Sequence, residues 1–155
     1  MRAVVLFDSE YGNTRKIAEA IAEVLEKRYD VELLPAADAE RITRRPDLLL
    51  VGSPTHHRRP TKRILAAIRS LPADVLNRVS AAAFCTRYDR PRFLTGAASL
   101  GIARALSRRG ARIEIAAESF QVSYRGGELV PGERSRARRW AFQLSHLTHP
   151  NPLDH

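Results

Sequence analysis

Short apolar runs alternate with longer amphipathic segments along the whole chain. Residues 3–7 and 48–51 are continuously apolar, and residues 79–84 form a run of small and apolar side chains. Between these runs, apolar side chains recur every three or four residues, which is the spacing of a helix with one buried face. This alternation predicts an α/β fold, a three-layer α-β-α sandwich around a five-stranded parallel sheet.

The polarity of the predicted strands indicates their order in the sheet. The runs 3–7, 48–51 and 79–84 are almost uniformly apolar, as expected for strands buried on both faces. Residues 31–34 and 113–115 include charged positions among the apolar ones, which is typical of edge strands. We therefore predict the strand order 2-1-3-4-5, with the second and fifth strands at the edges.

The helical segments have recognisable limits. Pro60 is expected to open one helix, and a later helix is expected over residues 96–106. Trp140 shares the apolar stripe of the last helix, so we expect it in the core. We assign residues 1–147 to one domain and residues 148–155 to a polar C-terminal tail.

The charge of the chain is strongly positive. Its 155 residues include 26 Lys and Arg against 17 Asp and Glu, a net charge of +9. Such a balance points to a nucleic acid, an anionic lipid or an acidic partner. Arginine far outnumbers lysine, and genome composition can produce the same excess. The chain lacks interleaved aromatic residues and a recognition helix, which argues against nucleic-acid binding.

Cysteine content and hydropathy indicate the compartment. Cys85 is the only cysteine, so an internal disulfide is excluded and we expect a structural thiol in a reducing environment. No apolar run approaches the roughly 20 residues of a membrane span. The apolar start of the chain is too short for a signal peptide. We therefore predict a cytoplasmic protein without a membrane span.

The loop after the first strand has the composition of an anion site. In a sheet of this order, ligands bind at the carboxyl ends of the strands, beside the switch point between the first and third strands. The loop 9–14 reads S-E-Y-G-N-T and leads directly into a helix. Its backbone N–H groups and the helix N-terminus suit a phosphate monoester. The alternative is a plain turn in which Asn13 or Ser9 caps the helix.

Competing sites of α/β folds are excluded by their missing motifs. The G-x-x-x-x-G-K and G-x-G-x-x-G strings do not occur, and Gly12 stands alone in its loop. A phosphoacceptor domain would need an aspartate at the end of the third strand, where Gly52 and Ser53 stand. A cysteine phosphatase would need an arginine six positions after Cys85, and that position is Pro91.

Three loops together resemble those of flavodoxins. Ser9–Thr14 is similar to the phosphate-binding loop of that family, Val51–Thr55 to its second flavin loop, and Phe84–Tyr88 to its third. The similarity spans about residues 1–145. It implies a short-chain flavodoxin-like domain with FMN as its cofactor.

The resemblance also implies a set of cofactor-binding residues. The first loop would hold the phosphate, and the second and third would border the isoalloxazine ring, with Tyr88 as a candidate for ring stacking. His56 and His57 stand where many flavodoxins have a tryptophan. The implied residues are Ser9, Glu10, Tyr11, Gly12, Asn13, Thr14, Ser53, Pro54, Thr55, His56, Thr86, Arg87 and Tyr88.

The surroundings of these loops differ from the family pattern in charge. Flavodoxins are typically acidic near the flavin edge, whereas this chain places basic residues in or beside the loops: Arg58, Arg59, Lys62, Arg63, Arg87, Arg90 and Arg92. We therefore expect a redox partner protein with an acidic surface.

Two functions remain open at this point. The first is an FMN-dependent electron-transfer protein, in which the cofactor supplies the redox chemistry. The second is an FMN-dependent oxidoreductase acting on a quinone, a porphyrinogen or NAD(P)H. We identify no catalytic set of side chains and no metal-ligating motif in the sequence, which favours the electron carrier.

Overall fold

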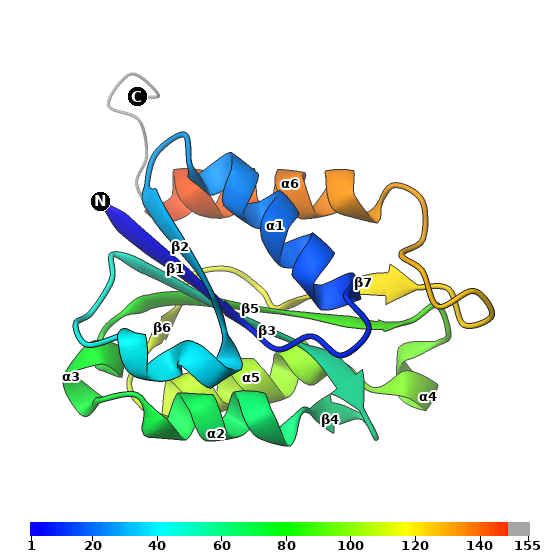
Figure 1. Ribbon diagram of the computed structural model, residues 1–155, viewed down its shortest axis with the longest axis horizontal. Helices are drawn as coiled ribbons and strands as arrows, with labels where there is room; N and C mark the ends of the chain where they lie inside the picture. The colour runs from blue at the N-terminus through cyan, green and yellow to red at the C-terminus, as the bar shows by residue number, and fades with distance from the viewer. Residues whose placement is uncertain (149–155) are drawn as a thin grey trace.

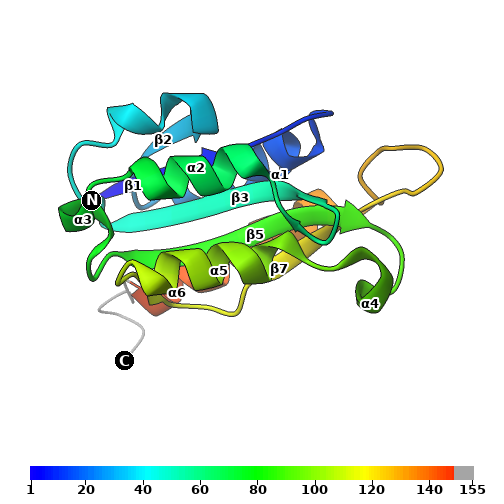
Figure 2. The ribbon, with the colours of Figure 1, turned by 90° about the horizontal axis from the view of Figure 1, so that it is seen from below.

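A parallel sheet between two layers of helices forms the centre of the structure, a computed structural model that describes residues 1–148 (Figures 1 and 2). Its strands are β1 (Arg2–Phe7), β2 (Asp30–Pro35), β3 (Leu48–His56), β4 (Arg59–Pro60), β5 (Ser80–Tyr88), β6 (Arg112–Ile113) and β7 (Glu118–Val122). Its helices are α1 (Asn13–Leu25), a 3₁₀ segment η1 (Ala36–Arg41), α2 (Lys62–Ser70), α3 (Ala73–Leu76), α4 (Arg92–Thr95), α5 (Ala98–Arg108) and α6 (Glu133–Thr148).

The strand order confirms the predicted fold class. The sheet runs β2-β1-β3-β5, and β6 and β7 both pair with the far side of β5. All of these pairs are parallel. The uniformly apolar runs are the central strands β1, β3 and β5, as their burial on both faces requires.

The predicted fifth strand is wrong in its extent. Instead of one strand at residues 113–115, the edge consists of β6, which pairs with Ser80 and Ala81, and β7, which pairs with Phe84–Tyr88. Residues 114–117 leave the strand conformation between them. The local alternation of apolar and charged residues indicates only the start of this edge, because β7 buries both Ser119 and Phe120 and follows no such alternation.

Two predicted helix starts also need correction. Pro60 lies in β4, the short antiparallel partner of β3, and α2 begins two residues later. Thr61 is its N-cap, and the Thr61 hydroxyl accepts a hydrogen bond from the Ile64 N–H at 3.2 Å. The helix expected from residue 96 begins at Ala98, because Gly96 adopts a left-handed φ of 68° and packs against the backbone of Arg58.

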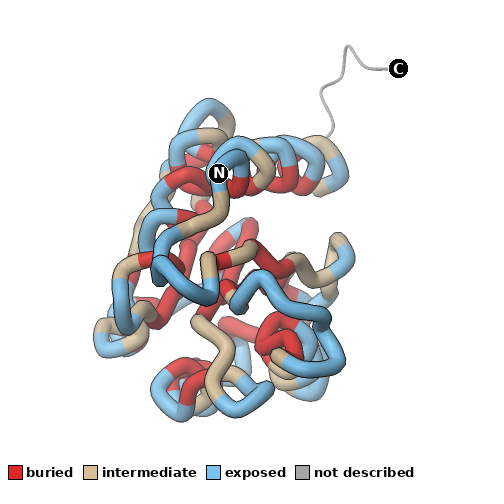
Figure 3. The backbone as a smooth tube through the Cα atoms, turned by 90° about the vertical axis from the view of Figure 1, so that its right-hand side faces the viewer, coloured by how far each residue is buried: buried red, intermediate tan, exposed pale blue. Residues whose placement is uncertain are grey.

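Two apolar cores fill the space between the sheet and its helices. One face of the sheet packs against α1 and α6, and the other against η1, α2, α3 and α5 (Figures 1 and 3). Trp140 is buried in the first core, with its ring edge-on to Phe84 and to Phe120 at centroid distances of 6.2 Å. This position confirms the sequence prediction for Trp140. Cys85 is a fully buried free thiol.

Of the predicted C-terminal tail, the structure describes only Thr148. Thr148, the first residue of the predicted tail, is the last residue of α6, and its hydroxyl donates to the Leu144 carbonyl at 3.0 Å. The remaining tail, residues 149–155, lies outside the described residues. Within residues 1–148, no helix combines the length and the apolar character needed to cross a membrane.

Candidate functional site

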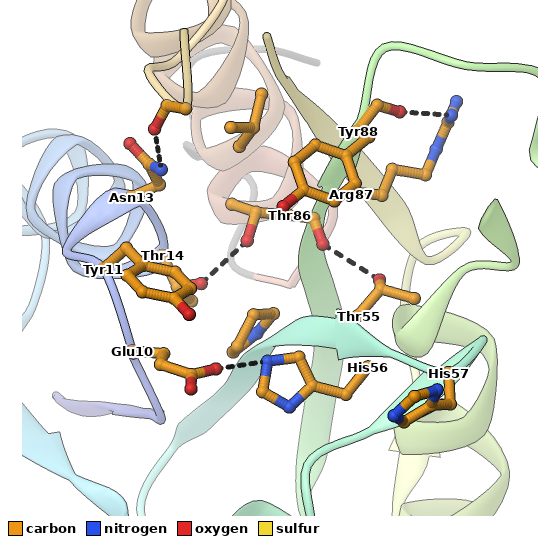
Figure 4. A pocket seen from close by; sticks show the side chains of 13 residues that line it. Glu10, Tyr11, Asn13, Thr14, Thr55, His56, His57, Thr86, Arg87 and Tyr88 are labelled. Atoms are coloured by element: carbon orange, nitrogen blue, oxygen red, sulfur yellow. Dashed lines mark hydrogen bonds and ion pairs between the residues drawn. The ribbon is translucent and has the colours of Figure 1, made fainter. Parts of the chain in front are cut away.

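A cavity of about 680 Å³ opens at the carboxyl ends of β1, β3 and β5 (Figure 4). Its volume lies in the range of small-molecule and cofactor sites. The cavity is lined by Glu10, Tyr11, Asn13, Thr14, Pro54, Thr55, His56, His57, Thr86, Arg87, Tyr88, Val122 and Gly127. Of the residues expected from the sequence, Ser9, Gly12 and Ser53 are outside this lining. The structure adds three lining residues to the implied set: His57, Val122 and Gly127.

The loop before α1 turns at Gly12. Gly12 stands before the first helical residue with a left-handed φ of 92°, which favours glycine. Within the described part of the chain, the backbone N–H groups of residues 10–14 make no hydrogen bond to the protein. They add to the positive end of the helix dipole at the cavity wall.

The alternative for this loop was a plain turn in which Ser9 or Asn13 caps the helix. Only the Ser9 contact is found. The Ser9 hydroxyl accepts from the Arg15 N–H at 3.3 Å, so it satisfies one donor of the first turn. Asn13 does not cap the helix, because its side-chain amide donates to the Gly127 carbonyl at 2.8 Å. Neither side chain therefore accepts from the backbone N–H groups of residues 10–14.

Three threonines fix the inner wall of the cavity. The hydroxyls of Thr14 and Thr86 are 2.8 Å apart and buried, which ties the start of α1 to β5. The Thr55 hydroxyl donates to the Thr86 carbonyl at 2.9 Å and accepts from the Ala98 N–H at 3.2 Å. Neighbouring elements are thus joined by short side chains that lose little conformational freedom on ordering.

His56 and Glu10 connect the first two loops across the cavity mouth. The His56 Nε2 and Glu10 Oε2 atoms are 2.5 Å apart, and both side chains are partly exposed. The following turn joins β3 to β4 with left-handed φ values of 48° at His57 and 73° at Arg58. Two such residues in a row form the tight hairpin turn that usually carries glycine or asparagine. The hairpin places His57 on the lining of the cavity.

A hairpin that the sequence did not reveal completes the cavity. Residues 123–130 turn back on themselves, with the Ser123 N–H donating to the Glu128 carbonyl and the Val130 N–H to the Gln121 carbonyl. The Tyr124 ring meets Tyr88 edge-on at a centroid distance of 5.3 Å. The adjacent pair Gly126-Gly127 was the only local signal for this turn.

The sequence matches a known protein family. The family model of the flavodoxin domain matches residues 4–92, more than half of the chain. This chain belongs to the flavodoxin family. No curated protein matches it.

Solved structures agree with the family at the level of the fold. Oxidised Flavodoxin 1 from Bacillus cereus superposes with a TM-score of 0.75 at 19% identity, over 93% of this chain and 97% of that one. A WrbA-like flavodoxin from Agrobacterium tumefaciens gives 0.74 at 19% identity, over 95% and 96%. A flavodiiron protein from Giardia intestinalis gives 0.75 at 18% identity over 95% of this chain, which corresponds to 36% of that larger protein.

The basic residues around this flavodoxin cavity are not equivalent. Arg63 pairs with Asp8 through an Nε–Oδ2 distance of 3.1 Å, and the Thr61 hydroxyl donates to the same carboxylate oxygen at 2.6 Å. Asp8 is buried and immediately precedes the first loop in the chain. The sequence did not single it out, although a carboxylate directly after an apolar strand was a signal for such a role.

Two further arginines are held by internal acceptors. The Arg87 Nε donates to the Ser119 hydroxyl at 2.8 Å, and its Nη1 donates to the Arg90 carbonyl at 2.8 Å. The Arg58 Nη1 donates to the carbonyls of Phe93 and Leu94 in α4. Arg87 thus lines the cavity while its guanidinium is held by groups of the protein itself (Figure 4).

A network of two carboxylates and Arg136 connects β7 to the first turn of α6. Arg136 forms ion pairs with Glu118 at 3.1 Å and with Glu133 at 2.7 Å, and the Gln121 N–H donates to Glu133 at 2.6 Å. Burial alone would raise the pKa of Glu133. The hydrogen bonds from Arg136 and Gln121, with the positive charge of Arg136, outweigh it and lower this pKa below 4.5. Glu133 is therefore ionised in the folded protein at neutral pH.

Proposed function

We propose that this flavodoxin-family protein binds FMN in the cavity and serves as a single-electron carrier between other proteins. FMN supplies the redox chemistry when it is bound, and the protein supplies binding, orientation and electrostatics. The backbone N–H groups of residues 10–14 would hold the phosphate. Pro54–His57 and Thr86–Tyr88 would border the flavin ring on its two sides.

The single observation that carries this proposal is the set of backbone donors at the start of α1. These N–H groups make no hydrogen bond within the described residues, and four of the five residues, Glu10, Tyr11, Asn13 and Thr14, line the cavity of about 680 Å³. A phosphate dianion satisfies such donors, and each charge-assisted hydrogen bond contributes about 1.5–3 kcal/mol. The residues present therefore fit FMN better than a flavin without phosphate.

The partner and the compartment are parts of the same proposal. A net charge of +9 favours a redox partner protein with an acidic surface. The one cysteine is a buried free thiol, which suits a reducing cytoplasm.

The visible spectrum of the purified protein, followed by a turnover assay, tests the proposal. We expect flavin absorption with one FMN per chain, and no oxidation of NADH or NADPH with a quinone unless a separate reductase is added. Turnover with NAD(P)H and quinone alone would instead establish the oxidoreductase alternative. A protein that neither carries nor takes up FMN contradicts both.

A further inference from the structure

The short helix α4 exposes two large apolar side chains beside the cavity. Phe93 is 73% exposed and Leu94 is 60% exposed. The helix projects at the end of the molecule where β3 and β5 finish (Figure 2). Adjacent apolar side chains on a projecting turn form a contact surface that water solvates poorly.

Arg58 fastens this turn to the cavity wall. Its guanidinium donates to the carbonyls of Phe93 and Leu94, and its backbone forms a bridge with Gly96. A side chain at position 96 would clash with Arg58, since an added Cβ would lie 2.6 Å from the Arg58 Cα. The hairpin after β3 and the helix α4 therefore form one unit, and that unit also carries the cavity-lining His57.

Arginines lie next to these elements along the chain: Arg90 and Arg92 precede Phe93, and Arg59 follows Arg58 in the hairpin. Arg59 and Arg92 are exposed, and neither side chain has an ion pair or a hydrogen bond within residues 1–148. The Arg90 guanidinium lies over the Tyr124 ring, 4.6 Å from its centroid. The one carboxylate in this segment, Asp89, accepts from the Tyr124 N–H at 2.9 Å.

We propose that Arg59, Arg90, Arg92, Phe93 and Leu94 form a docking patch for the redox partner. The partner presents carboxylates around a shallow apolar depression that receives Phe93 and Leu94. Arginine and aromatic side chains are the residues enriched in the energetic centres of interfaces, and a positive rim selects a negative one. This inference rests on the proposed function, and it gives the carrier a charge preference opposite to that of an acidic flavodoxin.

Electron transfer to two haem proteins of opposite charge tests the patch. The FMN-loaded, reduced protein is mixed with acidic cytochrome b5 or basic cytochrome c, and one electron passes from the flavin to convert ferric haem to ferrous haem. We expect a faster rate with the acidic protein at low ionic strength, and a fall in that rate as salt is added. A rate that favours the basic protein and falls with salt overturns the proposal.

Paired arginine variants separate the patch from the overall charge. The double variant Arg59→Gln, Arg92→Gln should slow transfer to cytochrome b5 by about three- to tenfold at low salt and leave it unchanged at high salt. The control Arg41→Gln, Arg108→Gln removes the same charge from exposed positions outside the patch and should reproduce the wild-type rate. Equal effects of the two pairs would show that only net charge matters.

Variants of the apolar side chains give a second, salt-independent signal. Phe93→Ser with Leu94→Ser should slow transfer severalfold at every ionic strength, while the midpoint of denaturant unfolding stays within error because both side chains are exposed. Phe142→Ser removes a side chain that is 57% exposed on α6 and should change neither quantity.

Membrane binding and failure of FMN uptake have distinct consequences. Co-sedimentation with vesicles of phosphatidylglycerol and phosphatidylcholine that is lost in the patch variants would make the surface a membrane contact and contradict the proposal. Failure of the wild-type protein to take up FMN would contradict the proposed function itself. Normal FMN uptake with unaltered transfer in both patch variants contradicts the docking patch alone.

Discussion

The two sides of the cavity provide positive potential in opposite ways. On the side of α1, residues 10–14 offer backbone N–H groups and a helix N-terminus, with no basic side chain in the cavity wall. On the other side, the end of β5 brings Arg87 to the cavity lining, and the hairpin after β3 carries Arg58 and Arg59. The positions of the backbone donors are fixed by the fold. The direction of each guanidinium depends instead on the hydrogen-bond acceptors near it.

The difference shows that an arginine beside a site need not act on that site. Arg63 is held by Asp8, Arg87 by Ser119 and the Arg90 carbonyl, and Arg58 by α4. These three guanidinium groups are held within the fold, whereas the side chains of Arg59, Lys62 and Arg92 have no ion pair or hydrogen bond within residues 1–148. We therefore expect ligand affinity to depend on the backbone side and partner choice on the arginine side.

The largest effect is expected at a short buried side chain, Thr61, rather than at an arginine. Thr61→Val removes both the hydrogen bond to Asp8 and the N-cap of α2, and should lower the free energy of unfolding by about 2–4 kcal/mol. Arg63→Gln removes only a solvent-screened partner of the same carboxylate and should cost less than about 1 kcal/mol. Urea denaturation of the two variants gives both numbers, and the reverse ranking would break the comparison.

The second-largest loss of stability is expected at Glu133, the carboxylate that holds Arg136. Glu133→Gln should lower the free energy of unfolding by about 1–2 kcal/mol at neutral pH, since charge-assisted hydrogen bonds to Arg136 and Gln121 are weakened. Because the folded-state pKa of Glu133 is lowered, its contribution is present above pH 4.5 and is lost as the pH falls below that value.

Denaturation curves between pH 7 and pH 3 check this dependence. The wild type and Glu133→Gln should converge in stability as Glu133 becomes protonated. A difference that stays constant over the whole range would show that the carboxylate charge is not what stabilises the connection between β7 and α6.

A matched pair of glycines tests the backbone side. Gly12 and Gly132 precede α1 and α6 with φ values of 92° and 91°, and an added Cβ meets nothing within 4 Å at either position. Replacing either by valine should cost about 1–2 kcal/mol of backbone strain. Only Gly12→Val should also weaken FMN binding, by about tenfold, because the loop relaxes away from the conformation that binds. Equal FMN affinities of the two variants would contradict the assignment of the first loop.

The smallest effect is expected at the arginine that lines the cavity. Arg87→Gln should change the FMN dissociation constant by less than about twofold, because its guanidinium is already held by Ser119 and the Arg90 carbonyl. Fluorescence titration of the variant beside wild type measures this. A tenfold loss of FMN affinity would show that Arg87 turns toward the ligand. Both sides of the cavity would then contribute to FMN affinity.

The parts that could be predicted from the sequence are those set by local pattern. The central strands follow from uninterrupted apolar runs, their order from the charges in the edge strands, and the loop 9–14 from its glycine and its place before a helix. The burial of Trp140 followed from the spacing of its apolar neighbours. Each of these features depends on residues close together in the chain.

The parts that escaped prediction depend on partners far apart in the chain. Hydrogen bonds join Asn13 to Gly127, Thr61 to Asp8, and Arg87 to Ser119. No local sequence pattern predicts such pairs. Likewise, β6 and β7 pair with different parts of β5, a strand that lies more than 20 residues before them in the chain. Arginine positions could be listed from the sequence, but their directions required the tertiary structure.

The affinity of the protein for FMN relative to riboflavin tests the central claim most directly. The two flavins share the ring and differ in the phosphate, so the ratio of their dissociation constants isolates the backbone donors of residues 10–14. Two or more charge-assisted hydrogen bonds to the phosphate predict FMN binding at least about 100-fold tighter than riboflavin binding in a fluorescence-quenching titration of the flavin-free protein. Equal affinities for the two flavins would contradict the account.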